Sequence, residues 1–423
     1  MKYDIHTLKN GLRIILAPMP QTETATVVVM TGTGSRYENE RENGLAHFLE
    51  HMFFKGTKKR KDARAISEEL DALGSIYNAF TAKDRTAYYA KVAGRDIDKA
   101  LDVVSDIFLN STLPQKEITK ERGAVIQEID MYEDMPMHTI DNVFDALIFG
   151  KEHPLGRTIL GPKENIRSFS RNDFTEYLAR NYNPQNTVVC IAGAFSTPKV
   201  LAKIKKEFGS LREGNPPQLI PFVEQQDAPQ ISIKEKKTDQ TQLMIGVPAY
   251  PYLHKDEYVL AVLATILGGG MSSRLFMEVR EKRGLAYSVQ AAVEKYPDTG
   301  YFVAQAGVEH GKLEKAVQTI LAEFKKIKNT LVSATELKKA KSYMKGTLTL
   351  SMESSNAIAQ SAASSLISIG KVRPLEEITK GLEKVTAKDI QRVAKDIFKT
   401  EKLNLAIIGP HLHKDKLLSL LRV

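Results

Sequence analysis

The stretch from Gly44 to Met52 reads Gly-Leu-Ala-His-Phe-Leu-Glu-His-Met and places two histidines and a glutamate among apolar residues. The spacing His-x-x-Glu-His is the inverse of the His-Glu-x-x-His arrangement of zinc-binding helices. Residues four apart share a helix face, so His47 and His51 can offer imidazole nitrogens to one ion. Glu50 lies on the same side, where it can accept a proton from water activated by the metal. Because such polar groups need partners in apolar surroundings, the motif predicts a metal site.

A third ligand has to come from elsewhere in the chain. Glu121 and Glu128 are seven residues apart in a helical stretch, so they fall on one face, two turns from each other. One of them can bind zinc, which accepts carboxylates, and the other can orient a ligating histidine. We expect Glu128 to complete the set with His47 and His51, holding one zinc ion per chain, and Glu121 to support it.

The sequence contains one module twice. Residues 74–77 match 284–287, and residues 88–94 match 301–307. A proline-rich stretch at mid-chain has little apolar periodicity and is typical of a linker. We therefore predict a zinc-binding catalytic module at 1–212, a linker at 213–230 and a homologous module without metal at 231–423.

Each module is expected to be α+β, a mainly antiparallel sheet covered by helices. Residues 25–30 alternate as a strand does, and residues 98–108 carry apolar side chains on one helical face. Ser170 and Thr386 stand three residues before an aspartate and are typical N-caps, so each half also repeats a helix.

Composition limits the other possibilities. With 423 residues, 42% hydrophobic and 26% charged, the chain has the make-up of a soluble globular protein of several domains. No signal-like segment or apolar run of about 20 residues is visible, so we expect a cytoplasmic protein without membrane contact. Cys190, the one cysteine, excludes an intrachain disulfide and is expected to pack in a buried strand.

The net charge of +9 does not by itself predict nucleic-acid binding. The basic clusters at 58–61 and 203–206 are short and typical of solvated surfaces. The run from Gly268 to Gly270 lacks the flanking residues of phosphate-binding loops, so nucleotide binding is not expected either.

Three segments, 44–57, 74–89 and 121–133, together resemble the pitrilysin/insulinase family of inverted-motif zinc peptidases. Mitochondrial processing peptidase and its short bacterial relatives are the most similar branch in length, and the resemblance covers both halves. It implies a zinc metalloendopeptidase that cleaves peptides or unfolded protein segments in an enclosed chamber. The residues that match the family's metal ligands are His47, His51 and Glu128, with Glu50 matching the base and Glu121 the supporting acid.

The resemblance also implies how substrate is held. In the family, an edge strand beside the zinc binds peptide as an added strand. The matching residues are Asn78, Ala79 and Phe80, although Phe80 could equally serve packing. In the second half, Arg280 and Tyr287 resemble a pair that binds the substrate backbone and the developing oxyanion. A surface ion pair and a core tyrosine are the alternatives for these two residues.

Assembly is the last expectation. Family members with four modules in one chain form a clamshell, so two modules correspond to half of it. A homodimer with Arg280 and Tyr287 acting in trans on the partner's zinc site is the simplest assembly. The alternatives are a noncatalytic assembly or chaperone subunit of the same fold, and the catalytic subunit of a heterodimeric processing peptidase.

Overall fold

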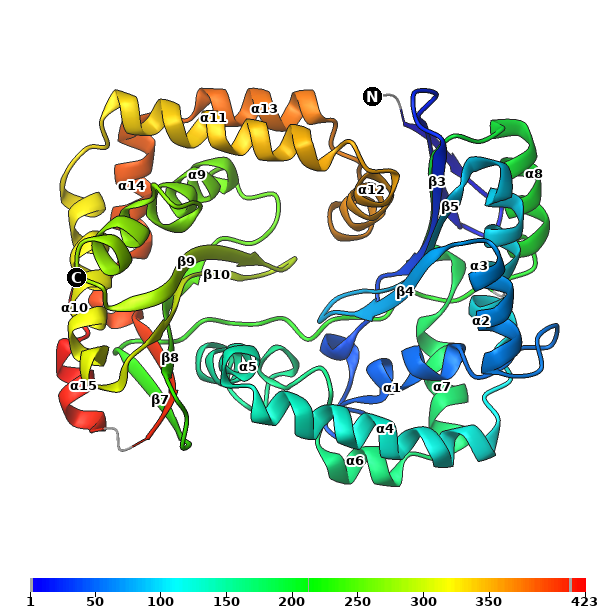
Figure 1. Ribbon diagram of the computed structural model, residues 1–423, viewed down its shortest axis with the longest axis horizontal. Coiled ribbons are helices and arrows are strands. Elements are labelled where there is room, and N and C mark those ends of the chain that lie inside the picture. The colour runs from blue at the N-terminus through cyan, green and yellow to red at the C-terminus, as the bar shows by residue number, and fades with distance from the viewer. Residues whose placement is uncertain (1–2, 212, 411–412) are drawn as a thin grey trace. The chain divides into compact units, whose positions relative to one another are not determined.

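The computed structural model describes residues 3–211, 213–410 and 413–423 (Figure 1). The bounds 1 and 212 of the first predicted module lie outside these residues. The chain forms two compact units, each built from three segments. Unit 1 comprises the described residues up to Asp130, then Arg157–Ile220 and Thr349–Pro374; unit 2 comprises Met131–Gly156, Pro221–Leu348 and Leu375–Val423.

Unit 1 contains a six-stranded sheet in the order β1-β2-β6-β3-β5-β4. The pair β2/β6 is parallel, and the other neighbouring pairs are antiparallel. The strands are β1 (Asp4–Thr7), β2 (Arg13–Pro18), β3 (Thr24–Thr31), β4 (Ile76–Thr81), β5 (Thr86–Ala93) and β6 (Thr187–Gly193). Cys190 lies buried in β6, as predicted.

Both faces of this sheet are covered. In β3, Val27 and Val29 join a core that includes side chains of α1 and α3, whereas Val28 and Met30 join a second core under α12, as the alternation of a strand requires. The helices with residues in unit 1 are α1 (Leu45–Phe53), α2 (Ala63–Ala72), α3 (Ile97–Asn110), α4 (Gln115–Asp134), α6 (Lys163–Ser168), α7 (Arg171–Asn181), α8 (Thr197–Phe208), the last residues of α11 (Ala334–Ser351) and α12 (Ser355–Ile369).

Unit 2 repeats the topology that the strands β2, β6, β3, β5 and β4 have in unit 1. Its five-stranded sheet has the order β7-β11-β8-β10-β9, with β7/β11 parallel and the rest antiparallel. The strands are β7 (Gln230–Glu235), β8 (Thr241–Ala249), β9 (Ala286–Lys295), β10 (Gly300–Val308) and β11 (Asn404–Gly409). Unit 2 contains the last residues of α4 and the whole of α5 (Pro136–Phe149). Its other helices are α9 (Glu257–Gly268), α10 (Leu313–Asn329), most of α11, α13 (Leu375–Lys384), α14 (Ala387–Ile397) and α15 (Lys414–Leu420).

The predicted fold class, two α+β modules with mainly antiparallel sheets covered by helices, is confirmed. The N-caps are confirmed as well, because Ser170 and Thr386 form capping boxes with Asp173 and Asp389. Short helical turns complete the secondary structure: η1 (Ser35–Tyr37), η2 (Gly94–Asp96), η3 (Pro154–Gly156), η4 (Pro184–Asn186), η5 (Phe276–Glu281), η6 (His310–Lys312) and η7 (Thr400–Lys402). Among the described residues, no helix is long and apolar enough to cross a membrane.

The division of the chain differs from the continuous modules predicted from the sequence. Helix α5 belongs to the first half of the sequence but packs on β8 and β11 of unit 2 through Ile140 and Phe144. Helix α12 belongs to the second half but lies beside β3 of unit 1 (Figure 1). It packs on β3 and β6 through Ile358 and Leu366. The two halves of the sequence therefore exchange one helix each. The chain also passes between the units at 220/221, inside the predicted linker.

Candidate metal centre

The helix α1, which carries the His-x-x-Glu-His motif, is anchored at its first turn by Glu38. Its N-cap, Gly44, has a positive φ of 101° and offers no side chain to cap the helix. Instead, the buried Glu38 carboxylate accepts hydrogen bonds from the backbone N–H of Gly44 (2.9 Å) and Ala46 (2.6 Å) and from Nδ2 of Asn43 (3.1 Å). Burial raises the pKa of Glu38 to about 7, although these hydrogen bonds oppose the increase. A distant acid thus satisfies the donors that a capping residue normally satisfies.

The apolar residues of α1 fix its orientation against the sheet. Phe48, Leu49, Met52 and Phe53 have no exposed surface and belong to the core of unit 1. His47 lies among them with 7% of its surface exposed. The helix therefore presents its polar residues from a rigid base.

His47, His51 and Glu128 converge on one point. Glu128 Oε2 lies 3.6 Å from His47 Nε2 and 3.3 Å from His51 Nε2, and the possible ligand atoms all lie within 4.8 Å of one another. Two ligands at 2.0–2.1 Å from a tetrahedral zinc ion are about 3.3–3.4 Å apart. The donor set and its spacing fit zinc. Within the described residues, no second group of three such side chains is found.

Glu121 and Lys55 extend the cluster beyond the three possible ligands. Glu121 Oε1 lies 3.0 Å from His51 Nδ1, and its Oε2 lies 2.7 Å from Lys55 Nζ. Burial alone would raise the pKa of Glu121, but the hydrogen bonds with His51 and Lys55 lower it below its usual value. The carboxylate therefore stays ionised and holds the His51 ring with Nε2 toward Glu128.

The histidines and acids also change one another's charge state. Interaction with His47 and His51 holds the pKa of Glu128 well below its usual range. Burial acts to lower the pKa of His51, but its hydrogen bonds to Glu121 and Glu128 outweigh this effect and raise the pKa to about 9. Without metal, the cluster is thus a compact ion-paired group, and a metal ion has to displace the proton of His51.

Glu50 lies beside this cluster and is held by β4. The hydroxyl Oγ1 of Thr81 donates a hydrogen bond of 2.5 Å to Glu50 Oε2. Among the described residues, none donates a hydrogen bond to the other oxygen, Oε1. Burial raises the pKa of Glu50, and the hydrogen bond from Thr81 opposes that increase. A carboxyl group with a raised pKa and one free oxygen suits a general base that works near neutral pH.

The predicted substrate-binding residues lie on β4, which is an edge strand of the sheet. The backbone N–H of Ala79 donates to Oδ1 of Asn78 at 2.8 Å, so this side chain occupies a donor of the strand. Phe80 is partly buried and packs against the core under α12. Phe80 therefore has the packing role considered for it, and contact of these residues with substrate stays a prediction.

The structure places Arg280 and Tyr287 next to each other in unit 2. The guanidinium carbon of Arg280 lies 4.9 Å from the centre of the Tyr287 ring and 4.8 Å from that of Phe276, a cation–π arrangement. Tyr287 is 76% exposed on the edge strand β9, so the alternative of a core tyrosine is wrong. Arg280 also pairs with Glu281 at 3.7 Å, as in the surface ion-pair alternative.

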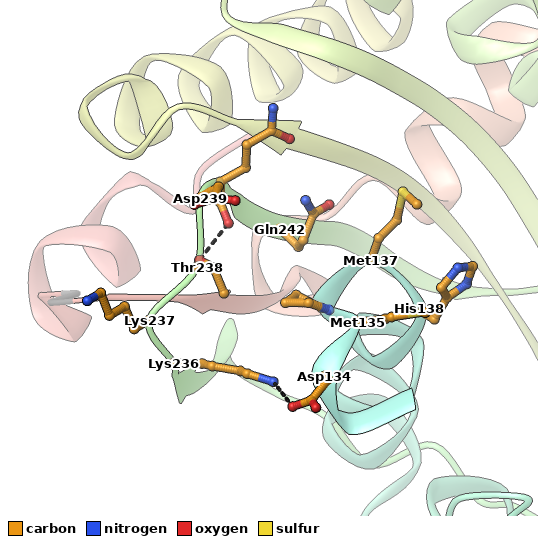
Figure 2. Close-up of a pocket in the computed structure, with 11 residues that line it drawn as sticks. Asp134, Met135, Met137, His138, Lys236, Lys237, Thr238, Asp239 and Gln242 are labelled. Atoms are coloured by element: carbon orange, nitrogen blue, oxygen red, sulfur yellow. Dashed lines mark hydrogen bonds and ion pairs between the residues drawn. The ribbon is translucent and has the colours of Figure 1, made fainter. Parts of the chain in front are cut away.

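Unit 2 also contains a cavity of about 770 Å³ between the start of α5 and the segment that joins β7 to β8 (Figure 2). Lys236 Nζ lies 3.5 Å from Asp134 Oδ1, whereas Lys237 points away from the first turn of α5 (Figure 2). In this cavity Lys236 is therefore paired with Asp134 and Lys237 is turned away from α5, in contrast to the convergent cluster of unit 1.

Three residues that contribute to the centre were missed by sequence reasoning: Glu38, Lys55 and Thr81. Lys55 follows His51 by four residues, so its place on the same side of the helix end could have been noted. Glu38 and Thr81 reach α1 from other elements of unit 1, and no local pattern predicts those contacts.

The fold and this cluster define a two-module α+β protein with a candidate metal centre. Known proteins that match the chain have the same two modules. The family description "Insulinase (Peptidase family M16)" matches residues 13–163, and "Peptidase M16 inactive domain" matches residues 168–344. An "uncharacterized zinc protease", YmxG, of Bacillus subtilis is 37% identical over 96% of this chain and 98% of its own length. The chain belongs to the insulinase family, peptidase family M16, which confirms the family expected from the sequence.

Two further relatives extend the comparison. An "uncharacterized zinc protease" of Rickettsia felis is 36% identical over 97% of this chain and 98% of its own length. The crystal structure of a protease from Helicobacter pylori superimposes with a TM-score of 0.89 at 26% identity, covering 97% of this chain and 99% of that one. The likeness therefore extends over both units and over nearly the full length of these relatives.

Proposed function

We propose that this protein is a zinc metalloendopeptidase that hydrolyses peptides or unfolded protein segments. The observation that carries the proposal is the convergence of His47 Nε2, His51 Nε2 and Glu128 Oε2 at separations that fit zinc, with Glu50 beside them. Relatives named zinc proteases that match nearly the whole chain support it.

In this proposal, His47, His51 and Glu128 hold the ion, and Glu121 keeps His51 in its ligating orientation. Zinc, when bound, supplies Lewis acidity toward a carbonyl and lowers the pKa of water at the site. Glu50 would take the proton of the attacking water through its free Oε1 and later pass it to the leaving amine. The peptide C–N bond breaks, and the products are a carboxylate and an amine.

The edge strand β4 is proposed to bind the substrate backbone by strand addition, which gives affinity with little dependence on sequence. Arg280 and Tyr287 are proposed to bind the substrate backbone and the oxyanion from a second copy of the chain, in a homodimer with two sites inside an enclosed chamber. The exposed ring of Tyr287 and its stacking with Arg280 are compatible with a preformed donor pair.

The test combines metal content with peptide cleavage. We expect the purified protein to retain about one zinc ion per chain, to cleave fluorogenic unstructured peptides, and to lose activity reversibly with a chelator. Glu50→Gln should retain zinc and lose activity by several orders of magnitude, because only the proton acceptor is removed. The matched control is Glu176→Gln, which changes an exposed glutamate on α7.

Zinc binding without cleavage, together with no effect of Glu50→Gln, would instead indicate the noncatalytic assembly or chaperone subunit. If cleavage appears only with an added nonidentical subunit, the heterodimeric processing peptidase is correct. Measuring the mass and activity of the protein purified alone separates that case from the homodimer.

A further inference from the structure

Thr81 is the last residue of β4, and its side chain lies on the face of the sheet that packs against α1. Alternate residues of a strand share a face, so Tyr77, Ala79 and Thr81 point to the same side. Tyr77 and Ala79 contribute to the core that contains the apolar residues of α1. The strand thus directs the Thr81 hydroxyl toward the helix that carries Glu50, where the 2.5 Å hydrogen bond forms.

The backbone around Thr81 is held from two sides. Thr81 is paired with Thr86 of β5, and the next residue, Ala82, donates to Arg85 O at 2.8 Å and accepts from Ser35 N at 3.3 Å. Gly34 permits this approach, since a Cβ at that position would lie only 2.1 Å from Ala82 O. The position of the hydroxyl is therefore set by the sheet and by η1 together.

This single hydrogen bond restrains Glu50 in a particular way. Glu50 is partly buried and, among the described residues, Thr81 alone donates a hydrogen bond from its side chain to the Glu50 carboxylate. With Oε2 occupied by the hydroxyl, the rotation of the carboxylate is fixed and Oε1 is left for another proton donor. A base has to lie within about 2.6–3.2 Å of the proton it accepts, so this orientation matters for proton transfer.

We propose that Thr81 is a positioning residue for Glu50, which it holds in the orientation that leaves Oε1 available to the attacking water. This inference rests on the proposed peptidase function and deepens it. It makes β4 serve two purposes, because the strand proposed to bind the substrate backbone also orients the base that acts on that substrate.

The test compares variants that differ in the hydroxyl alone. Thr81→Val keeps the shape and removes the donor, and Thr81→Ser keeps the donor. We expect Thr81→Val to retain zinc and a KM within about twofold of the wild type, with kcat reduced about ten- to a hundredfold, and Thr81→Ser to recover most of the loss. The control is Thr175→Val on α7, whose hydroxyl donates to Asn172 O of its own helix and makes no other hydrogen bond with the part of the chain that the structure describes. If Thr81→Val prevents folding, Thr81→Ala removes the same donor without adding bulk.

An unchanged kcat in Thr81→Val or Thr81→Ala, with an active wild type, would overturn the inference and leave the proposed function intact. A second readout does not depend on activity. In crystal structures of the zinc-loaded proteins, we expect one Glu50 orientation in the wild type and in Thr81→Ser, and several in Thr81→Val. If Glu50 keeps its single orientation in Thr81→Val, the inference is wrong even if the protein cleaves no peptide. Loss of the proposed function itself would appear as a zinc-loaded wild type that cleaves nothing and equals Glu50→Gln.

Discussion

The exchange of α5 and α12 predicts that the first half of the sequence cannot fold alone. A fragment of residues 1–212 contains every strand of the unit 1 sheet but lacks α12. In the intact chain, Ile15, Val28, Met30 and Val188 have no exposed surface and belong to the core that α12 completes. Without the helix, these four side chains would face water.

The cost can be worked out from these residues. Complete burial of a large apolar side chain contributes about 1.5–3 kcal/mol, so uncovering four of them costs about 6–12 kcal/mol. This is an upper bound, since unfolded chains already bury some apolar surface. The free energy of unfolding of a typical domain is only about 5–15 kcal/mol. The fragment is therefore expected to be unfolded or partly collapsed.

Cys190 gives a direct assay, because it is the chain's one cysteine and lies fully buried in the same core. We expect its thiol to react with a maleimide at the rate of a free thiol in the fragment and far more slowly in the intact chain. As a control, the full chain cut within the linker 213–230 should stay associated and keep the thiol protected. A fragment of residues 1–212 that unfolds cooperatively and protects Cys190 would refute the reasoning.

Three further predictions concern the metal centre and its assembly. Glu121→Gln should weaken zinc affinity about 10–100-fold in chelator competition, since His51 loses its charged partner; unchanged affinity would contradict the role of Glu121. Mixing Glu50→Gln subunits with Tyr287→Phe subunits should restore one working site per mixed dimer if Tyr287 acts in trans, and peptide cleavage that shows no recovery would exclude it. Burial raises the pKa of Glu38 to about 7 from an ordinary value of 4.5. Between pH 4.5 and 7, Glu38 is therefore protonated in the native state and ionised in the unfolded state. The free energy of unfolding of the metal-free protein should therefore fall by about 3 kcal/mol as pH rises from 4.5 to 7, and Glu38→Gln should lack this fall in urea titrations; equal slopes would show that Glu38 is not responsible.

The centre was predictable where its geometry follows from local periodicity. The spacing of His47, Glu50 and His51 fixes one face of α1, and the seven-residue spacing of Glu121 and Glu128 fixes one face of α4. Both sets of residues come together in the structure. What joins the two helices is tertiary packing, which no local pattern predicts. The spacing did not decide between Glu121 and Glu128, and the resemblance to the family agreed with the choice of Glu128.

The remaining features depend on contacts that the sequence does not encode locally. Glu38 acts as the cap of α1 from six residues before Gly44, because the turn between them folds back on the helix. The sheet on which α12 packs could not be predicted from the sequence either. The apolar and small residues of α12 indicate a helix that packs closely, but no periodicity states which sheet it covers.

The exchange of helices also bears on the history of the repeat. After a duplication that merely joined two self-sufficient modules, the copy without the metal motif could be lost with little harm to the other. Here the second copy supplies α12, which covers one face of the sheet in the unit that contains His47, His51 and Glu128. Selection for the copy with the His-x-x-Glu-His motif therefore also preserves its partner, and the second copy can lack that motif without becoming dispensable.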